Sequence, residues 1–286
     1  MTWRAAVGLA AAVLAVSWGA PLARMTAAAP LAVAMWRMVL AAGMLLPFAA
    51  VRGKLPIPSR HRLAASLSGL FLGMHFGLWI PSLWLTSVSA SVVLVSTAPL
   101  WVLLLSPRFL GGRISTRNVA SFTAALAGVA IIAGGDFQLS REAVIGDLMA
   151  LVGAACMAGY LVVGKRLRRD VPLAGYLTIV YGGAALALIV GVLALGVRPW
   201  PSRAVAWLPL VAMAVGPTLT GHTLLNWSLA HLEAYRVNLA VLMEPVLASL
   251  WTWMVIGEAP PLHVVPGAAL VLGALALEFV PGKGTG

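Results

Sequence analysis

Long apolar runs separated by short polar links fill most of the chain. A bilayer core about 30 Å thick needs about 20 apolar residues in a helix. Lipid offers no partner to the backbone of an open strand, so each run predicts a helix. The runs predict ten membrane spans, at 5–23, 31–51, 64–85, 88–106, 118–135, 144–164, 173–196, 204–229, 235–257 and 263–280. The predicted fold class is therefore an all-α polytopic membrane protein with ten transmembrane helices.

One apolar run repeats the pattern of an earlier one. Val237–Ile256 is interrupted near its middle by Glu244 and Pro245. Subtracting 146 from these numbers places Pro245 on Pro99, which interrupts the apolar run 88–106. Interrupted hydrophobic segments at matching places in two halves of a membrane protein indicate a transport site.

The composition supports the membrane assignment. Of the 286 residues, 61% are hydrophobic and only 9% are charged, whereas soluble domains are about 25% charged. The formal net charge of +11 would suggest a nucleic-acid partner in a soluble protein. Here the basic residues cluster in the links between apolar runs, which membrane topology explains. We therefore expect a lipid bilayer and no nucleic acid as partners.

The sequence contains no motif of a metal site or of a common enzyme class. The single cysteine, Cys156, lies inside an apolar run, so no intramolecular disulfide forms and no Cys/His metal spacing exists. No Gly-x-Ser-x-Gly, His-Glu-x-x-His or Walker-type glycine motif occurs either. We expect a protein that is not an enzyme and that has no cofactor and no metal. His75 and His222 leave an intramembrane enzyme open as an alternative.

Lysine and arginine predict the orientation in the membrane. With the amino terminus in the cytoplasm, the cytoplasmic segments hold 14 of these residues and the opposite segments hold 4. The positive-inside rule then places both termini in the cytoplasm. Arg4 and the apolar run after it also resemble a cleaved signal peptide. Counting this run as a span is preferred, because it makes the two halves of the chain match.

Each half of the chain then has five spans. The predicted organisation is a first repeat at 1–135, a periplasmic linker at 136–145 and a second repeat at 146–286. Because five is odd, the second repeat enters the membrane from the opposite side. The repeats are therefore expected to be inverted, related by a pseudo-two-fold axis in the membrane plane.

Several short motifs resemble those of a known transporter family. The first half has the pair Trp18-Gly19 late in its first span and the Ser-rich turn Ser87–Ser91 leading to Pro99. The second half has the series Glu233-Ala234, Glu244-Pro245 and Gly257-Glu258. With the two five-helix halves, these motifs resemble the drug/metabolite transporter superfamily and its EamA-type repeat over essentially the whole chain. One departure is Gly112, which stands where the repeat usually has the acid seen at Glu258.

Within that superfamily, the length and the wealth of tryptophan most resemble the bacterial aromatic amino-acid exporters of the YddG-like branch. The resemblance implies a secondary transporter of the bacterial inner (cytoplasmic) membrane that exports amino acids by alternating access. Export of drugs, nucleobases or vitamins is the alternative within the same fold, and a lipid-handling enzyme or membrane scaffold is the alternative outside it. Small residues such as Gly128 and Gly273 could pack helices within one chain or between two, so a monomer and a weak homodimer both stay open.

Glu244 lies deep within a predicted span. It is about nine residues from the start of the span, hence roughly 13 Å deep at 1.5 Å per residue. A charge at such a depth costs at least about 2.5–3.5 kcal/mol, which makes it a functional candidate. Glu244 could bind a substrate ammonium group, carry a proton, or be a protonated or paired structural residue. Pro99 and Pro245 each free a helical carbonyl, which could bind a ligand, act as a hinge or only kink the helix.

Two pairs of residues share a helix face through a spacing of four. His75 and Trp79 form one pair, and His222 and Asn226 form the other. Histidine and asparagine are costly against lipid, so both faces should point inwards, where they either line a cavity or join helices. His222 is, with Glu244, a candidate for proton coupling.

Aromatic residues within the spans could form the walls of a substrate cavity. Trp18, Trp79, Trp101 and Tyr160 are candidates, because such rings suit apolar or aromatic side chains of a substrate. Arg37, about six residues into its span, could capture a carboxylate or snorkel to the outer surface, and snorkelling is favoured. The predicted substrate site, for a small amphipathic molecule such as an amino acid, comprises Trp18, His75, Trp79, Pro99, Trp101, Tyr160, His222, Asn226, Glu244 and Pro245.

Overall fold

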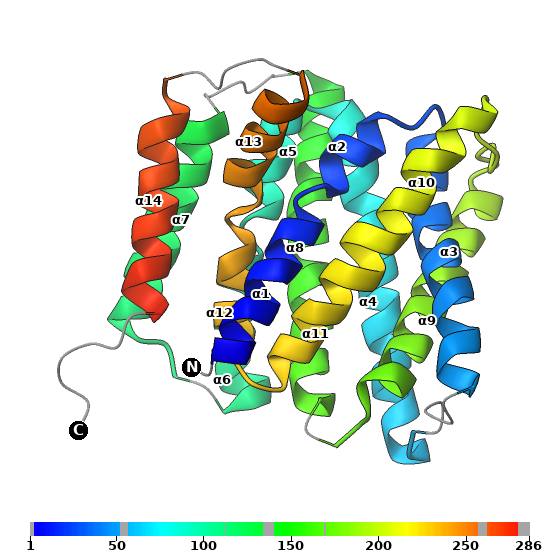
Figure 1. Ribbon diagram of the computed structural model, residues 1–286, viewed down its shortest axis with the longest axis horizontal. Coiled ribbons are helices and arrows are strands. Elements are labelled where there is room, and N and C mark those ends of the chain that lie inside the picture. The colour runs from blue at the N-terminus through cyan, green and yellow to red at the C-terminus, as the bar shows by residue number, and fades with distance from the viewer. Residues whose placement is uncertain are drawn as a thin grey trace.

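The computed structural model describes residues 3–51, 57–111, 113–133, 140–168, 170–256 and 262–279. Within these residues every regular element is a helix, as the apolar runs predict. Figure 1 shows the helices side by side between an upper and a lower end of the bundle. Gly112 and Glu258, at which the two halves were expected to differ, lie outside the described residues.

The helices follow one another along the chain with short connections. The first half holds α1 (Trp3–Val16), α2 (Gly19–Arg24), α3 (Pro30–Val51), α4 (Ser59–Leu85), α5 (Val88–Val95), α6 (Ala98–Leu110) and α7 (Thr116–Ala133). The second half holds α8 (Arg141–Leu167), α9 (Leu173–Ala194), the 3-10 turn η1 (Ala204–Ala206), α10 (Trp207–Met213), the π-helix η2 (Ala214–His222), α11 (Thr223–Leu229), α12 (Ala234–Val241), α13 (Glu244–Ile256) and α14 (Val264–Phe279).

Seven helical stretches among the described residues are long and apolar enough to cross a membrane, so the chain is a multi-pass membrane protein. They lie at Trp3–Arg24, Pro30–Val51, Ser59–Leu85, Ala90–Leu110, Arg141–Leu167, Leu173–Ala194 and Ala204–Leu229. The other three expected spans are also helical. Of these, α7 and α14 are shorter apolar helices, and α12–α13 is interrupted. The number of ten crossings therefore stays a prediction.

Three of the expected spans are each broken into two helices, and a proline follows each break. The breaks lie at 17–18 between α1 and α2, at 96–97 between α5 and α6, and at 242–243 between α12 and α13. Proline has no N–H group and its ring clashes with the carbonyl four residues earlier, which favours a break before Pro21, Pro99 and Pro245. Proline alone does not force a break, because Pro47, Pro81 and Pro107 lie inside continuous helices. The predicted interruptions at Pro99 and Pro245 are confirmed, whereas the break before Pro21 was not predicted.

The expected span 204–229 departs from an α-helix in its middle, where η2 is a π-helix. Pro217 has no N–H group to donate to the carbonyl of Met213. The hydroxyl of Thr218 donates to that carbonyl oxygen instead, at 3.0 Å. Short π-helical segments of this kind frequently occur at functional sites, and η2 borders the cavity described below.

The centre of the bundle is built on α4, which packs against α8 and α9. Glycine lets α4 and α9 approach closely. A Cβ atom on Gly69 would lie 2.7 Å from the carbonyl oxygen of Val180, and one on Gly73 would lie 3.1 Å from that of Ala184. Such small residues let helix backbones approach in lipid, where packing drives association. The contact holds α4 in place, and α4 carries three residues of the central cavity.

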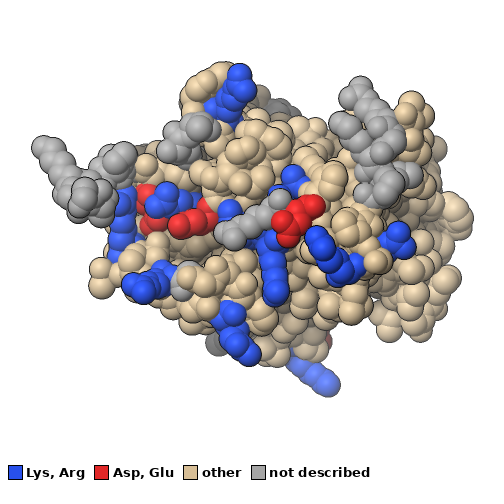
Figure 2. All heavy atoms as spheres, turned by 90° about the horizontal axis from the view of Figure 1, so that it is seen from below, with Lys and Arg blue, Asp and Glu red and all other residues tan. Residues whose placement is uncertain are grey.

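The lower end of the bundle is its more basic end, and Figure 2 shows this face with lysine and arginine spread across it. The described basic residues at the lower ends of helices are Arg4, Arg60, Arg62, Arg108, Arg113, Arg117, Lys165, Arg166, Arg168 and Arg236. Those at the upper end are Arg24, Arg141, Arg198 and Arg203. The first residue of α1 and the last residue of α14 both lie at the lower end (Figure 1).

A buried acid that the sequence pattern did not indicate lies at this lower end. Glu278, in the last turn of α14, is 2% exposed and pairs with Arg236 of α12 at 3.2 Å. Asn118 and Ser121 of α7 also donate to its carboxylate, at 3.3 Å. The cluster joins α7, α12 and α14.

Two glycines bring α7 and α14 together as a pair at one side of the bundle (left in Figure 1). A Cβ atom on Gly128 would lie 2.6 Å from the carbonyl oxygen of Gly267, and one on Gly267 would lie 2.7 Å from that of Gly128. Gly128 therefore packs helices within one chain. A Cβ atom on Gly273 would meet no neighbouring heavy atom within 4 Å.

We expect Gly128→Ala to destabilise the protein, because the added methyl group must push two backbones apart. Overpacking of this kind costs about 1–3 kcal/mol, so the melting temperature of the purified protein in detergent should fall. Gly273→Ala, on the same helix pair but in open space, is the matched control and should melt as the wild type does. Equal melting temperatures for the two variants would contradict the contact.

Candidate functional site

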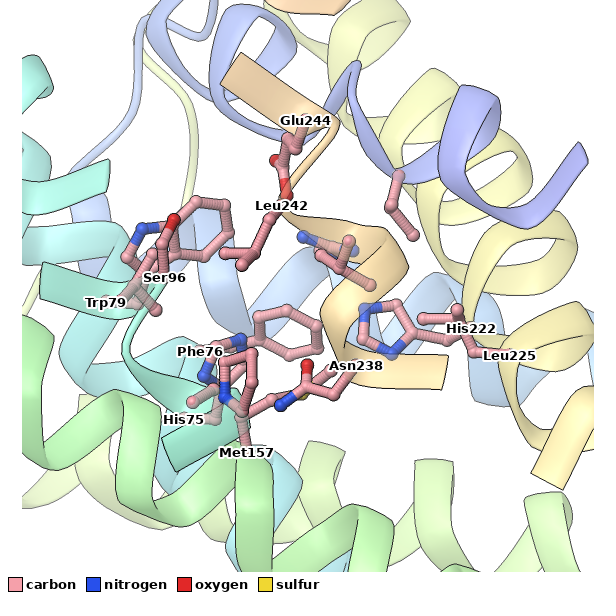
Figure 3. Close-up of a pocket in the computed structure, with 16 residues that line it drawn as sticks. His75, Phe76, Trp79, Ser96, Met157, His222, Leu225, Asn238, Leu242 and Glu244 are labelled. Atoms are coloured by element: carbon pink, nitrogen blue, oxygen red, sulfur yellow. The ribbon is translucent and has the colours of Figure 1, made fainter. Parts of the chain in front are cut away.

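A cavity lies inside the bundle where the breaks of α5–α6 and α12–α13 meet α1, α3, α4, α8 and η2 (Figure 3). Its volume is about 50 Å³. One buried water needs at least about 10–15 Å³, so this space has room for a few water molecules but not for a metabolite. Its lining comprises Val16, Arg37, His75, Phe76, Trp79, Val95, Ser96, Ala98, Pro99, Met157, His222, Leu225, Asn238, Val241, Leu242 and Glu244.

The two helix breaks lie at this cavity. Pro99 has no N–H group for the carbonyl of Val95, and Pro245 has none for the carbonyl of Val241. Both Val95 and Val241 line the cavity. Irregular backbone at membrane depth is tolerated where it is buried in protein or lines a water-filled cavity. The breaks thus place residues from both halves of the chain around the cavity.

Arg37 points into the bundle, which corrects the expectation that it snorkels to the surface. Its side chain is 1% exposed, and its Nε donates to the Thr218 hydroxyl at 2.7 Å. The guanidinium carbon lies 4.0 Å from the centroid of the Phe76 ring. Its Nη1 atom is buried and has no hydrogen-bond partner. Snorkelling fails because η2 and α4 pack against α3, so the head group reaches the cavity instead of water.

Glu244 lines the cavity as the first residue of α13. A carboxylate is favourable at this position because the amino-terminal end of a helix carries partial positive charge. A Cβ atom built on Gly19 would lie 3.9 Å from Glu244 Oε1, 3.7 Å from Arg37 Nη1 and 3.6 Å from Trp79 Cη2. The ion pairs within 4.0 Å in the described part of the chain do not include Arg37 or Glu244. The two opposite charges therefore border one gap without closing it.

Histidine and aromatic rings form the cavity wall opposite Glu244 (Figure 3). His75 and Trp79 share one face of α4, as their spacing predicts, and their rings stack with centroids 5.7 Å apart. His75 Nδ1 donates to the Gly153 carbonyl at 2.9 Å, because a carbonyl oxygen can only accept. His222 meets the Phe76 ring at 5.3 Å, and its Nδ1 is buried without a hydrogen-bond partner.

Five of the ten predicted site residues line this cavity, namely His75, Trp79, Pro99, His222 and Glu244. Tyr160 and Asn226 lie outside the lining. Asn226 donates from Nδ2 to the Tyr160 hydroxyl and to the His222 carbonyl, the latter at 2.8 Å. Asn226 therefore joins α11 to α8 and supports the helix turn that carries His222.

Trp18, Trp101 and Pro245 also lie outside the lining. Trp18 stacks on Trp251 of α13 with ring centroids 5.3 Å apart, so its ring lies against that helix. Trp101 is half-buried in α6, and Pro245 is buried directly after Glu244. Position within a span predicts the depth of a side chain but not the direction in which it points.

Several lining residues were not predicted, namely Arg37, Phe76, Ser96, Met157 and Asn238. Asn238 has a buried Nδ2 without a hydrogen-bond partner. Its amide, inside an apolar run and six residues before Glu244, was a signal present in the sequence. Phe76 and Met157 give no such signal, because lipid tails are as apolar as these side chains.

A larger hollow of about 370 Å³ lies between α1, α12–α13 and α14. Its lining consists of the apolar residues Ala6, Leu9, Ala10, Val13, Leu14, Ala240, Met243, Leu247, Leu275 and Phe279. Ligand sites combine apolar walls with a few placed polar groups, and these side chains provide none. The cavity between Arg37 and Glu244 is therefore the candidate site. Among the described residues, no three His, Cys, Asp or Glu side chains are grouped to hold a metal ion.

Comparison with known proteins gives consistent matches along the chain. The sequence model of the EamA-like transporter family matches residues 3–134 and 144–280. The uncharacterized transporter YdfC of Bacillus subtilis is 26% identical over 251 residues, which cover 86% of this chain and 81% of that protein. A riboflavin transporter of Brucella anthropi is 25% identical over 260 residues, which cover 85% of each chain. One solved crystal structure has the same fold over 98% of both chains, with a TM-score of 0.79 and 23% sequence identity.

We expect Thr218→Val to destabilise the protein, because it removes the acceptor of the Arg37 Nε hydrogen bond and the donor to Met213. Hydrogen bonds to charged groups contribute about 1.5–3 kcal/mol, so thermal unfolding in detergent should shift clearly downwards. The control is Thr220→Val in the same π-helix. The Thr220 hydroxyl also donates to a carbonyl five residues earlier, at 2.9 Å, but it is exposed. Equal shifts in melting temperature for the two variants would contradict a stabilising hydrogen bond between Thr218 and Arg37.

Proposed function

Because this chain belongs to the EamA-like transporter family, we propose that it exports small amphipathic metabolites, amino acids in particular, by alternating access. The observation that carries the proposal is the cavity between Arg37 and Glu244. It combines a guanidinium and a carboxyl group with aromatic walls at the point where two membrane spans are broken. A zwitterion with an apolar side chain matches each of these features.

We propose that the chain consists of two inverted repeats, at 1–135 and 146–286, joined by a linker at 136–145. Three observations support this organisation. The family model matches twice, the breaks at 96–97 and 242–243 are 146 residues apart, and α1 begins at the end of the bundle where α14 finishes.

We also propose that the lower end of the bundle faces the cytoplasm and that the protein resides in the bacterial inner membrane with both termini inside. The excess of described lysine and arginine at the lower end supports this orientation. The relatives from Bacillus subtilis and Brucella anthropi are bacterial proteins. The linker would then lie in the periplasm.

The small volume of the cavity means that the proposed transport requires a conformational change. Because about 50 Å³ admits only a few waters, the helices must separate before an amino acid can enter. The breaks at 96–97 and 242–243 offer hinges, since Thr97, Leu242 and Met243 donate to carbonyls three residues earlier instead of four. Pro99 and Pro245 then remove one further backbone donor each. Movement at these hinges would open the site to one side of the membrane at a time.

A second substrate class follows from one relative. The Brucella anthropi protein is named a riboflavin transporter, and Phe76 and Trp79 could stack on the rings of a vitamin as well as on an aromatic amino acid. We therefore keep vitamin transport as the alternative. The charged pair of Arg37 and Glu244 favours the amino acid.

Counterflow separates these possibilities. We expect purified protein in liposomes preloaded with an unlabelled amino acid to accumulate the same radiolabelled amino acid, because exchange through an alternating site needs no energy source. A panel of aromatic and aliphatic amino acids, riboflavin and a nucleobase identifies the substrate class, and protein-free liposomes are the control. Flux of riboflavin alone would favour the alternative. Absence of flux for every solute would instead point to an enzyme or scaffold.

We expect Glu244→Gln to reduce transport at least about tenfold without reducing the amount of protein in the membrane, because the shape of the side chain is kept and only its charge is lost. If Glu244 binds ammonium, the half-saturation concentration rises. If it carries a proton, counterflow persists while accumulation driven by a pH gradient is lost. Glu142→Gln, at an exposed position of α8, is the control. Wild-type transport by the Glu244 variant in both assays would exclude both roles.

A further inference from the structure

Arg37 is a buried cation that makes no direct ion pair within the described residues. Its Nε is held by Thr218 and one face of its guanidinium rests on Phe76. Its Nη1 is buried and unpartnered, and no carboxylate among the described residues lies within 4.0 Å of it. A charge in a membrane protein interior is costly, and the charged residues that occur there usually mark an ion or substrate path. The free Nη1 atom therefore indicates an anionic ligand.

Gly19 locates the place where such a ligand would bind. The point that its Cβ would occupy lies within 4 Å of Arg37 Nη1, Glu244 Oε1 and Trp79 Cη2, and every one of these distances is ordinary van der Waals contact. A glycine at this position leaves open a space bordered by a cation, an acid and an aromatic ring. Glu244 on the far side makes the space unfavourable for a doubly charged anion such as phosphate, since like charges repel at short range.

We propose that this gap is a subsite for the carboxylate of the transported solute, bound by Arg37 Nη1 while Glu244 faces the ammonium group of the same zwitterion. The subsite deepens the proposed function and rests on it. Trp79 closes the third side of the subsite and Phe76 holds the guanidinium in place. A solute without an anionic group leaves the guanidinium unpaired, so the subsite discriminates against neutral solutes, including uncharged vitamins.

Pairs of ligands that differ only in the carboxylate test the subsite directly. The probes are L-phenylalanine against L-phenylalaninol, L-leucine against L-leucinol, and 3-phenylpropionate against 3-phenylpropanol. Binding to the full-length protein in lipid nanodiscs is measured by the rise in melting temperature with ligand concentration. We expect at least one carboxylate to bind about tenfold or more tightly than its matched alcohol. If no pair differs by that factor, the proposal is overturned.

Two variants then assign the carboxylate preference to this gap. Arg37→Gln keeps a donor near Thr218 but removes the charge, so the preference for the carboxylate should disappear. Gly19→Ala keeps Arg37 and fills the gap with a methyl group at contact distance, so carboxylate binding should weaken about tenfold or more. Gly43→Ala, on the same helix as Arg37 and with no heavy atom within 4 Å, should bind as the wild type does.

The outcomes separate the subsite from the transport function. Wild-type binding by Gly19→Ala, or a carboxylate preference that persists in Arg37→Gln, would reject the subsite even where counterflow occurs. Carboxylate binding that depends on Arg37 and Gly19 would support the subsite even in a protein that moves no solute. If Arg37→Gln does not fold, Gly19→Ala decides the question alone.

Discussion

Every backbone N–H and C=O group inside a bilayer needs a partner within the protein, because lipid supplies none. Pro21, Pro99, Pro217 and Pro245 each remove one backbone donor from a membrane span. Three of these positions follow a break between two helices, and the fourth lies in a π-helix where the Thr218 hydroxyl replaces the missing donor. These irregular segments border the central cavity or adjoin residues that line it. The irregular segments therefore lie beside the polar interior, whose polar side chains Arg37, His75 and Asn238 come from regular helices.

The π-helix also determines where positive charge lies. Thr218 donates to the Met213 carbonyl and accepts from Arg37 with the same hydroxyl, and Tyr181 donates to the Thr218 carbonyl at 3.2 Å. The Thr218 side chain thus supplies the donor that the Met213 carbonyl lacks and positions the Arg37 guanidinium. Together with the Phe76 ring, it holds a cation whose free edge faces Glu244. A stability role alone does not account for an arginine whose Nη1 is buried and unpartnered.

The hydrophobic pattern predicted the ends of the described spans to within a few residues, because bilayer thickness imposes a length on every crossing. The spacing of His75 and Trp79 correctly predicted a shared face. The predicted direction of the Arg37 side chain was wrong, because its depth in the span suits both snorkelling and the cavity. Which of the two occurs depends on how η2 and α4 pack against α3. The placement of Trp18 in the cavity lining failed for a related reason. Trp18 lies in the break at 17–18, so helical spacing from neighbouring residues does not predict where its side chain points.

Under the proposed function, a solute in the gap touches elements that the helix breaks allow to move separately. Arg37 is tied to η2 through Thr218, Glu244 begins α13 directly after the break at 242–243, and Gly19 begins α2 after the break at 17–18. The charges of Arg37 and Glu244 are held apart in this conformation. A zwitterion that contacts both would favour conformations in which these elements approach. A ligand shifts a conformational equilibrium only by binding two states unequally. Under the proposed function, the separation between the guanidinium and the carboxylate would couple solute binding to closure.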